Sequence, residues 1–360
     1  MSLPTIPPGP VPLAIIGGTG LSSLPSPPFT PVAKIPLSAL ETPWGIPSSP
    51  ITILKYSSPT TTSDQSLEGK GEGEGALLVA FLARHGEHHN LTPTEIPQRA
   101  NVAALKKLGV KAAIGWSAVG SLREEVRPRD FLVLGGVVDW TKGFRPSTFF
   151  ENGIVGHVSM ADPFDKPLSK IITKAISAPR VLEGNEGDAI RVHGDATTIC
   201  IGAVAPLSDK VLAYLDIETD FASCRRTSIL YSRRIHPLQK SPNPPSNLMY
   251  WYDLGPRVQA IPRSRDRIRA DYDSWHETNE GVSVEMVMGH MAANSQNAKR
   301  AIAAIVEELG KGEVDIFEED RLKRQSRGGI MGLERQKEGK GAEAVERLTW
   351  LFGDEWVRGK

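Results

Sequence analysis

Short apolar runs alternate with a stretch of helical periodicity in the first half of the chain. Residues 13–16, 76–82, 110–114 and 131–138 are almost wholly apolar, which is typical of strands buried on both faces of a sheet. Between the second and third runs, residues 97–108 place apolar side chains at helical spacing. Strands that alternate with helices predict an α/β fold, in which helices flank a β-sheet.

Two further helices are expected toward the C-terminus. Residues 282–309 have an amphipathic pattern long enough for one helix, with a candidate break near Asn294. Residues 343–351 predict a short helix near the end of the chain. We therefore expect a folded α/β domain over residues 11–318, followed by a charge-rich, glycine-punctuated C-terminal segment over residues 319–360.

Three polar stretches interrupt these elements. The proline-rich residues 1–10 are expected to form a disordered tail. The glycine-rich residues 57–75 carry too little apolar surface to pack and predict a flexible insertion. Residues 184–188, with the sequence GNEGD, predict a turn.

The balance of charge narrows the classes of partner. Lysine and arginine total 42, as do aspartate and glutamate, so neither nucleic acid nor an anionic membrane is expected as a partner. Only two cysteines occur, which argues against a disulfide scaffold and favours a reducing compartment. No apolar run is long enough to span a bilayer, and the N-terminus lacks a secretory signal pattern. We expect a soluble protein of the cytoplasm, with the nucleus as a further compartment.

Two strand ends are candidate anion sites. The sequence of residues 16–20, IGGTG, lets backbone N–H groups approach an anion and adds the hydroxyl of Thr19, although a plain tight turn explains it better when it is taken alone. Its glycine spacing is not that of the dinucleotide fingerprint, which disfavours a dehydrogenase. Arg84, at the end of the second strand, can hold phosphate with two hydrogen bonds. The alternatives are a surface salt bridge for Arg84 and a structural hydrogen bond for His85.

Hydroxyl and carboxyl groups provide two further candidates. Ser117 ends the third predicted strand and, with Ser121, can line a ligand pocket. Ser121 and Glu124 also fit a helix capping box. Asp271 and Asp273 can hold or accept a proton as a pair, whereas the alternative is a solvated acidic turn.

Together these motifs resemble the methylthioadenosine phosphorylases, within the wider group of purine nucleoside phosphorylases. Their order and combination are far more specific than any one of them. The matching runs are AIIGGTGL (14–21), FLARHGEHHNLTPTEIPQRANVAALKKLGV (81–110), SAVGSLREEVRPRDFLVL (117–134), FRPSTFF (144–150), GHVSMADPF (156–164) and DYDSWHETNEGVSVEMV (271–287).

The resemblance implies a single-domain α/β fold with a mixed β-sheet flanked by helices, assembled as a homotrimer. It also implies phosphorolysis in purine and methionine salvage. Inorganic phosphate would attack the anomeric carbon of S-methyl-5′-thioadenosine, with adenine and 5-methylthioribose-1-phosphate as products. The expected partners are a nucleoside and its co-substrate phosphate, and the resemblance implies no metal or organic cofactor.

By matching position, the resemblance assigns Thr19, Arg84 and Ser117 to phosphate binding and places His85 beside the phosphate. The transition state of the reaction is oxocarbenium-like, so the placement of charge matters more than covalent chemistry. His157 is implied to lie on the rim of the site that a neighbouring subunit contributes.

For the nucleoside, the resemblance implies that Asp271 and Asp273 face adenine. A carboxyl group there can donate or share a proton with the departing base. Ala118 is implied to line the base pocket, and Val284 and Val287 to form an apolar wall for the methylthio group.

Residues 201–270 depart from the family pattern. Family members have a Gly-Pro-x-Phe segment, a Ser/Thr-Arg-Ala-Glu run, a Met-Thr or Met-Ser pair, a Pro-Glu pair and a strand before the acidic pair, and none is visible here. The codons possible for residues 249–269, read one base later, permit the missing Met-Thr and Pro-Glu. We therefore interpret this stretch as mis-framed or mis-spliced sequence. The alternative is true divergence with a remodelled loop and reduced activity.

Two other functions fit parts of the pattern. A purine nucleoside phosphorylase for inosine or guanosine is the first, but the acidic pair and the two valines favour a 6-aminopurine with a 5′-thioether. A catalytically impaired nucleoside-binding relative is the second, and the missing phosphate and ribose residues favour it.

Overall fold

The computed structural model describes most of the first 200 residues and much of the C-terminal part of the chain. The predictions for residues 1–10, 57–75 and 184–188 fall mostly outside the described residues. The described ranges are 7–18, 21–58, 77–119, 125–126, 129–141, 145–146, 148–156, 162–184, 189–201, 221–222, 229–231, 257–263, 284–312, 316–318, 330–332 and 338–354.

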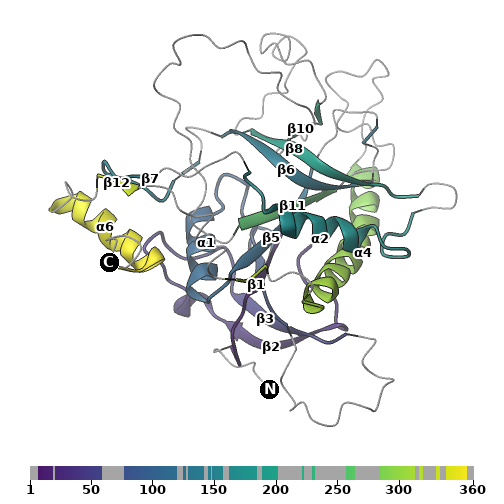
Figure 1. Cartoon of the computed structure of the whole chain (residues 1–360), viewed down its shortest axis with the longest axis horizontal. Helices are drawn as coiled ribbons and strands as arrows, with labels where there is room; N and C mark the ends of the chain where they lie inside the picture. Colours follow the sequence, from purple (N-terminus) through teal and green to yellow (C-terminus); the bar gives the residue numbers. More distant parts are fainter. Residues whose placement is uncertain are drawn as a thin grey trace.

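A six-stranded mixed sheet forms the centre of the molecule (Figure 1). Four neighbouring strands run parallel, and the last two strands are joined to them by antiparallel pairs. The strands expected near residues 13–16, 76–82 and 110–114 are all confirmed within this sheet. In spatial order they are β11 (Arg257–Arg263), β5 (Ala112–Ala118), β1 (Leu13–Gly17), β4 (Leu78–Ala83), β3 (Ile51–Tyr56) and β2 (Phe29–Ile35).

A second sheet of four strands lies beside the first, and a third sheet has only two strands. The strand expected at 131–138 is confirmed, but it begins the second sheet. Trp116 of β5 packs against Phe131 of β6, with ring centroids 5.6 Å apart, and joins the two larger sheets through a buried aromatic contact. The strands are β6 (Phe131–Trp140), β8 (Val192–Ile201), β10 (Ile229–Tyr231) and β9 (Phe221–Ala222) in the second sheet, and β7 (Val155–Gly156) and β12 (Ile330–Met331) in the third.

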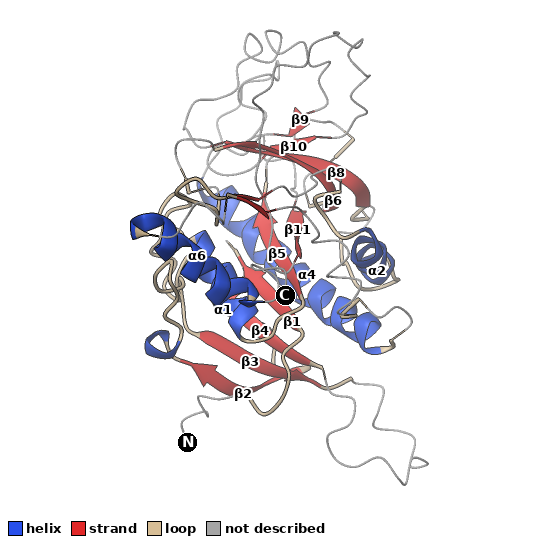
Figure 2. Cartoon of the chain, turned by 60° about the vertical axis from the view of Figure 1, so that its left-hand side comes forward, coloured by secondary structure: helices blue, strands red, loops and turns tan. Residues whose placement is uncertain are grey.

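Helices cover both faces of the central sheet (Figure 2). The expected helix at 97–108 is confirmed as α1 (Gln98–Lys107), which packs on one face. On the other face lie α2 (Lys166–Ile176) and α4 (Val284–Gly310), which contact each other. The expected α/β fold with a mixed sheet flanked by helices is therefore confirmed.

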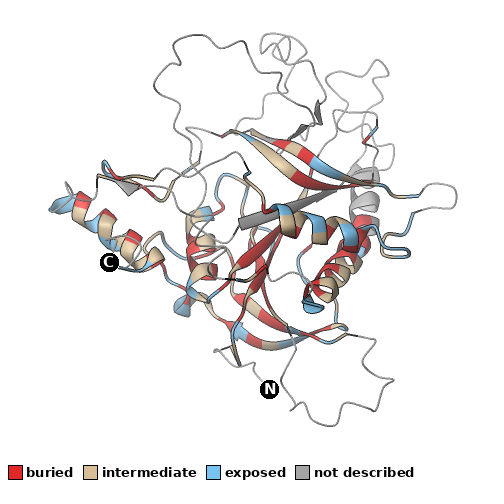
Figure 3. Ribbon diagram, in the orientation of Figure 1, coloured by how far each residue is buried: buried red, intermediate tan, exposed pale blue. Residues whose placement is uncertain are grey.

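Strand β1 shows why its sequence is continuously apolar. Successive side chains of a strand point to opposite faces of the sheet. Leu13 and Ile15 belong to the core beneath α2 and α4, whereas Ala14 and Ile16 belong to the core beneath α1. Figure 3 shows the central strands as buried, in contrast to the alternating pattern of the edge strand β2.

Helix α4 is continuous from Val284 to Gly310, so the expected break near Asn294 is wrong. Asparagine lowers helix propensity by only about 0.7 kcal/mol relative to alanine. Asn294 is itself buried, and after it Ala298, Ile302 and Ile305 are fully buried at helical spacing. Packing of this apolar face outweighs the local preference. Among the described residues, no helix is both long and apolar enough to cross a membrane.

The stretch over residues 201–270 contributes a strand that the sequence did not predict. Strand β11 pairs in parallel with β5 over seven positions, from Arg257 opposite Ala112 to Arg263 opposite Ala118. The family's strand before Asp271 is not visible in the sequence, and β11 is a strand that the sequence did not indicate. Parallel pairing uses backbone groups of any sequence, and proline is tolerated in a strand at the edge of a sheet.

The C-terminal segment ends in a helix that packs onto the rest of the domain. Helix α6 (Gly339–Phe352) begins earlier than the predicted residue 343, and its apolar face buries Ala344 and Leu348 against Phe150 and Ile154. Glu151 also accepts a hydrogen bond from Arg347 of α6, at 3.3 Å. The same carboxylate forms a salt bridge with Arg99 of α1. The helix is therefore part of the packed structure.

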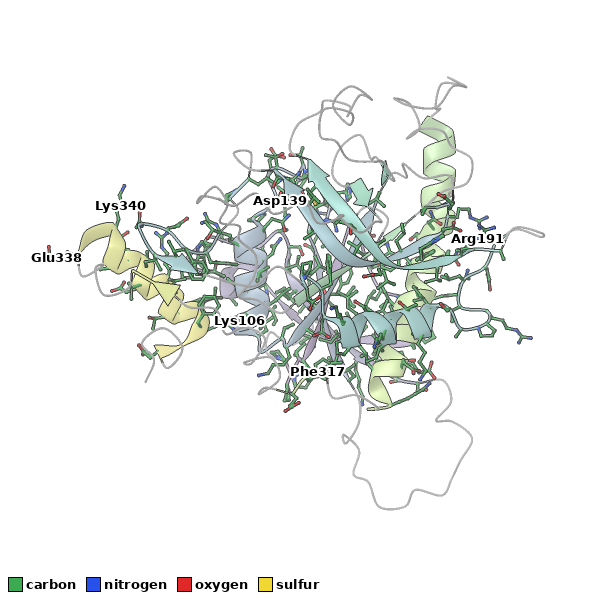
Figure 4. The ribbon with its side chains drawn as sticks, turned by 45° about the horizontal axis from the view of Figure 1, so that its top comes forward. Lys106, Asp139, Arg191, Phe317, Glu338 and Lys340 are labelled. Carbon is green, nitrogen blue, oxygen red and sulfur yellow. The ribbon has the colours of Figure 1, made fainter. Side chains whose placement is uncertain are left out.

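The end of α1 adds a second contact with α6. The Lys106 ammonium lies 5.3 Å from the ring centroid of Phe352, and that of Lys107 lies 4.8 Å from the ring of Trp350. Such cation–π contacts contribute about 0.5–1 kcal/mol each at exposed sites. Figure 4 shows Lys106 beside the inner end of α6, whereas Lys340 lies at the outer end.

Replacing Ile302 with alanine should test the core beneath α4. Ile302 is fully buried, so Ile302→Ala leaves a cavity and is expected to lower the free energy of unfolding by about 2–5 kcal/mol in urea titrations. Ile46 is 50% exposed, so Ile46→Ala is the matched control and should change that energy by less than about 0.5 kcal/mol. Equal effects from the two variants would contradict the packing described here.

Candidate functional site

Polar groups meet where the parallel strands of the central sheet end. Gly17 is the last residue of β1, Arg84 directly follows β4, and Ser117 is the last residue but one of β5. Since β1 pairs in parallel with both β4 and β5, these residues share one edge of the sheet. Ligands of open α/β sheets bind at the carboxyl ends of the strands. This edge is therefore the candidate site.

Arg84 is the centre of this edge. Its Nη1 donates a short hydrogen bond to the carbonyl oxygen of Trp116, and its Nη2 donates to the Ser117 hydroxyl at 3.2 Å. Its backbone N–H donates to the carbonyl of Gly17 at 3.1 Å. The backbone of Arg84 is thus held by β1, the neighbour of β4, and its guanidinium group by β5, the next strand beyond β1.

The surroundings of Arg84 make it a desolvated cation. Part of its surface stays accessible, but closely packed protein removes most of the water around the guanidinium. Desolvation is the largest cause of a lowered pKa at Arg84; Cys200 opposes this shift and the charge of Arg145 adds to it, so that together they bring the pKa to about 10. The group remains charged at neutral pH, and a buried cation needs a compensating anion.

Gly18 has no room for a side chain. A Cβ atom built there would lie 2.3 Å from the carbonyl oxygen of Trp116 and 2.4 Å from Nη2 of Arg84. Glycine is therefore required at position 18, because the Arg84 guanidinium lies close to the backbone that follows β1. The N–H of Leu21 donates to the Gly18 carbonyl at 2.9 Å, as the tight-turn interpretation of this motif expects.

His85 has a defined tautomer. Its Nδ1 lies 2.8 Å from the carbonyl oxygen of Leu91, which can only accept, so Nδ1 carries the proton. Desolvation lowers the pKa of His85, the hydrogen bond to Leu91 opposes this shift, and Arg84 and His89 lower the pKa further. The rings of His85 and His89 are 4.6 Å apart. His85 is therefore neutral at neutral pH, with Nε2 as a hydrogen-bond acceptor.

The turn that carries His85 also requires glycine. Gly86 has a φ angle of +83°, in the left-handed region that favours glycine. A Cβ atom at this position would lie 2.2 Å from Oδ1 of Asn90. The structure thus gives each residue of the Arg-His-Gly sequence a physical setting: a desolvated cation, a fixed imidazole and a tight turn.

Comparison with known proteins identifies the family. Residues 74–205 match the sequence model of the Phosphorylase superfamily. The chain is 40% identical over 345 residues to an S-methyl-5′-thioadenosine phosphorylase of Emericella nidulans, with 95% of this chain and 83% of the relative covered. It is 42% identical over 302 residues to the enzyme of that name from Tuber melanosporum, covering 84% and 82% of the two chains.

The chain belongs to the S-methyl-5′-thioadenosine phosphorylase family. A crystal structure of a family member from an antarctic soil metagenomic library is similar, with 26% identity, a TM-score of 0.61, and coverage of 95% of this chain and 99% of that chain. The methylthioadenosine phosphorylase of Schistosoma mansoni in complex with adenine has the same fold, with 21% identity, a TM-score of 0.59, and coverage of 88% and 97%.

Of the residues expected from the family resemblance, the structure brings together Arg84 and Ser117, and His85 directly follows Arg84 in the chain. Ala118 is the last residue of β5, directly after Ser117, and only its backbone is described. The N-terminal end of α4 contains Val284 and Val287, whose side chains lie outside the described residues. The other expected residues of the family site, together with the capping pair, also lie outside them: Thr19, Ser121, Glu124, His157, Asp271 and Asp273.

The structure adds three groups to this edge that the sequence did not predict. They are the Trp116 carbonyl, Cys200 near the end of β8, and Arg145, which follows β6. A backbone carbonyl leaves no signal in the sequence. Arg145 does leave one, because it follows an apolar run by a few residues, as Arg84 does. Within the described ranges, no group of three or more His, Cys, Asp or Glu side chains is arranged to hold a metal ion.

A methyl group at Gly18 should disturb the site. Gly18→Ala forces the new Cβ against Arg84 and Trp116, and overpacking of this kind costs about 1–3 kcal/mol of unfolding free energy. The matched control is Gly310→Ala at the end of α4, where a Cβ meets nothing within 4 Å. Urea titration of both variants measures the difference. A Gly18→Ala protein as stable as Gly310→Ala would contradict the close approach.

The depressed pKa of His85 should appear in the pH dependence of stability. A folded-state pKa below the ordinary 6.5 gives stability that is present above pH 6.5 and is lost as the pH falls below it. His85→Asn keeps an N–H for the Leu91 carbonyl but does not titrate. Its free energy of unfolding should therefore fall less than that of the wild type between about pH 7 and about pH 5. Identical pH dependence in both proteins would show that His85 is not desolvated.

Proposed function

We propose that this chain catalyses the phosphorolysis of S-methyl-5′-thioadenosine. Phosphate and the nucleoside give adenine and 5-methylthioribose-1-phosphate. The observation that carries the proposal is the desolvated Arg84 cation, held by two hydrogen bonds to β5 at the carboxyl edge of the sheet. The substrate is supported by the relatives, which are named S-methyl-5′-thioadenosine phosphorylase at 36–42% identity.

Arg84 and Ser117 suit the phosphate. The guanidinium supplies charge and planar donors, and the Ser117 hydroxyl, held by Nη2, can turn its own proton toward an oxygen of the anion. Neutral His85 adds an acceptor for the proton of hydrogen phosphate. The oriented anion then attacks without first having to reorganise its surroundings, which is the main contribution of such sites.

The bond changes need one proton for the base. An oxygen of phosphate forms a bond to C1′ of the ribose while the C1′–N9 bond breaks, and its electron pair passes to the purine. Protonation of the purine, at N7, makes it a better leaving group. The family resemblance assigns this proton to the carboxyl pair Asp271 and Asp273.

We also propose the remaining properties of the family for this chain. It acts as a homotrimer, in which His157 lies on the rim of a neighbouring subunit's site. It needs no metal or organic cofactor beyond its co-substrate phosphate, and it works in the cytoplasm, with the nucleus as a further compartment.

The purified protein should release adenine from S-methyl-5′-thioadenosine only when phosphate is present. Inosine, which lacks both the 6-amino group and the thioether, should react with a kcat/KM lower by at least about 100-fold. Arg84→Gln removes the fixed charge and should lower kcat/KM by about 100- to 1,000-fold. Chromatographic measurement of the released base tests all three. A folded protein that releases no adenine would instead identify a catalytically impaired relative, and faster turnover of inosine a purine nucleoside phosphorylase.

A further inference from the structure

A second arginine, Arg145, lies near Arg84 at the carboxyl ends of the strands. Arg145 belongs to the loop that follows β6, which is parallel to β8 and runs beside β11. Asp139 holds the start of this loop, because its Oδ1 accepts from the backbone N–H of Thr141 at 2.8 Å and from its hydroxyl at 2.6 Å. The N–H of Arg145 donates to the Thr141 carbonyl at 3.3 Å, which holds Arg145 close to the end of the strand.

The Arg145 guanidinium is incompletely satisfied. Its Nε is buried and has no hydrogen-bond partner within the part of the chain that the structure describes. A buried donor without a partner is destabilising, and more so when the group is charged. A ligand that supplies the missing acceptor is one physical reason for which native proteins retain such a group.

The charge of Arg145 acts on the phosphate site. It is close enough to Arg84 to lower the pKa of that residue, which is repulsion between two like charges in a desolvated place. Among the described residues, the group that offsets this positive charge at Arg84 is the thiol of Cys200, a single weak acid. Two guanidinium ions and one weak acid leave a net positive charge, which suits an anionic ligand such as hydrogen phosphate.

We propose that Arg145 is a second phosphate-binding residue. Its Nε–H donates to a phosphate oxygen that Arg84 does not contact, so that the dianion lies between the two guanidinium groups. The site combines a donor from the end of β4 with one from the loop after β6, and phosphate binding removes both the unpaired donor and the repulsion. This assignment rests on the proposed function, because it takes phosphate as the ligand of the edge.

Arg145→Gln tests the assignment in the full-length protein. The variant should raise the KM for phosphate by about 10- to 100-fold, the usual effect of losing a charged hydrogen bond, and leave the KM for S-methyl-5′-thioadenosine within about threefold. Arg145→Lys keeps the charge but loses Nε, so it should recover only part of the loss. A KM for phosphate within about twofold of the wild type in Arg145→Gln would overturn the proposal.

Arg191→Gln is the matched control. Arg191 is exposed and lies at the opposite end of the β6–β8 pair from Asp139, as Figure 4 shows. This variant removes the same charge and should leave the KM for phosphate unchanged. A rise equal to that of Arg145→Gln would show a general effect of net charge and overturn the assignment.

Thermal unfolding with inorganic phosphate separates this proposal from the proposed function. A ligand that binds only the folded state raises Tm with its concentration. Phosphate should raise the Tm of the wild type and of Arg191→Gln, and raise that of Arg145→Gln much less. If this pattern holds without adenine release, Arg145 binds phosphate and the proposed reaction is wrong. If phosphate raises Tm equally in all three proteins, Arg145 does not contact it.

Discussion

The site depends on one buried cation held by its neighbours in the sheet. The guanidinium of Arg84 reaches from the end of β4 to the carbonyl of Trp116 and the hydroxyl of Ser117. Its backbone pairs with Gly17, and its side chain fits because Gly18 has no Cβ. These contacts fail if the parallel register of three strands shifts by one residue, because the side chains would then point to the other face. The packed core of the domain is what sets the position of this charge.

Much of the fold follows from the sequence, for a clear physical reason. Strands such as β1 face a core on both sides, so their apolar runs are unbroken and easily found. Strand β8 was not predicted because it mixes polar and apolar residues, VHGDATTICI, beside a partly exposed partner. Strand β11 was not predicted because its sequence, RVQAIPR, has little strand character, and only its pairing with β5 defines it. Tertiary pairing decides such cases, and propensity does not.

The site was predicted only in part, for a related reason. Arg84, His85 and Ser117 follow recognisable strands, and the geometry of parallel strands brings such ends together. The Trp116 carbonyl, which accepts from Arg84, has no residue signature, and Arg145 becomes relevant only once β6 is placed beside the central sheet. The tautomer of His85 likewise depends on its hydrogen bond with the Leu91 carbonyl, which only the folded structure reveals. Sequence names the side chains, whereas packing assigns their partners and charge states.

Glu151 links the C-terminal helix α6 to helix α1. Residues 145–146 and 148–151 belong to one stretch, and Arg99 of α1 binds both the Thr148 carbonyl and the Glu151 carboxylate. Arg347 of α6 shares that carboxylate. Through Arg347, helix α6 thus helps to hold Glu151, which lies in the same stretch of chain as Arg145. A substitution in α6 can therefore reach the surroundings of Arg145 through Glu151, although the helix itself lies elsewhere in the fold.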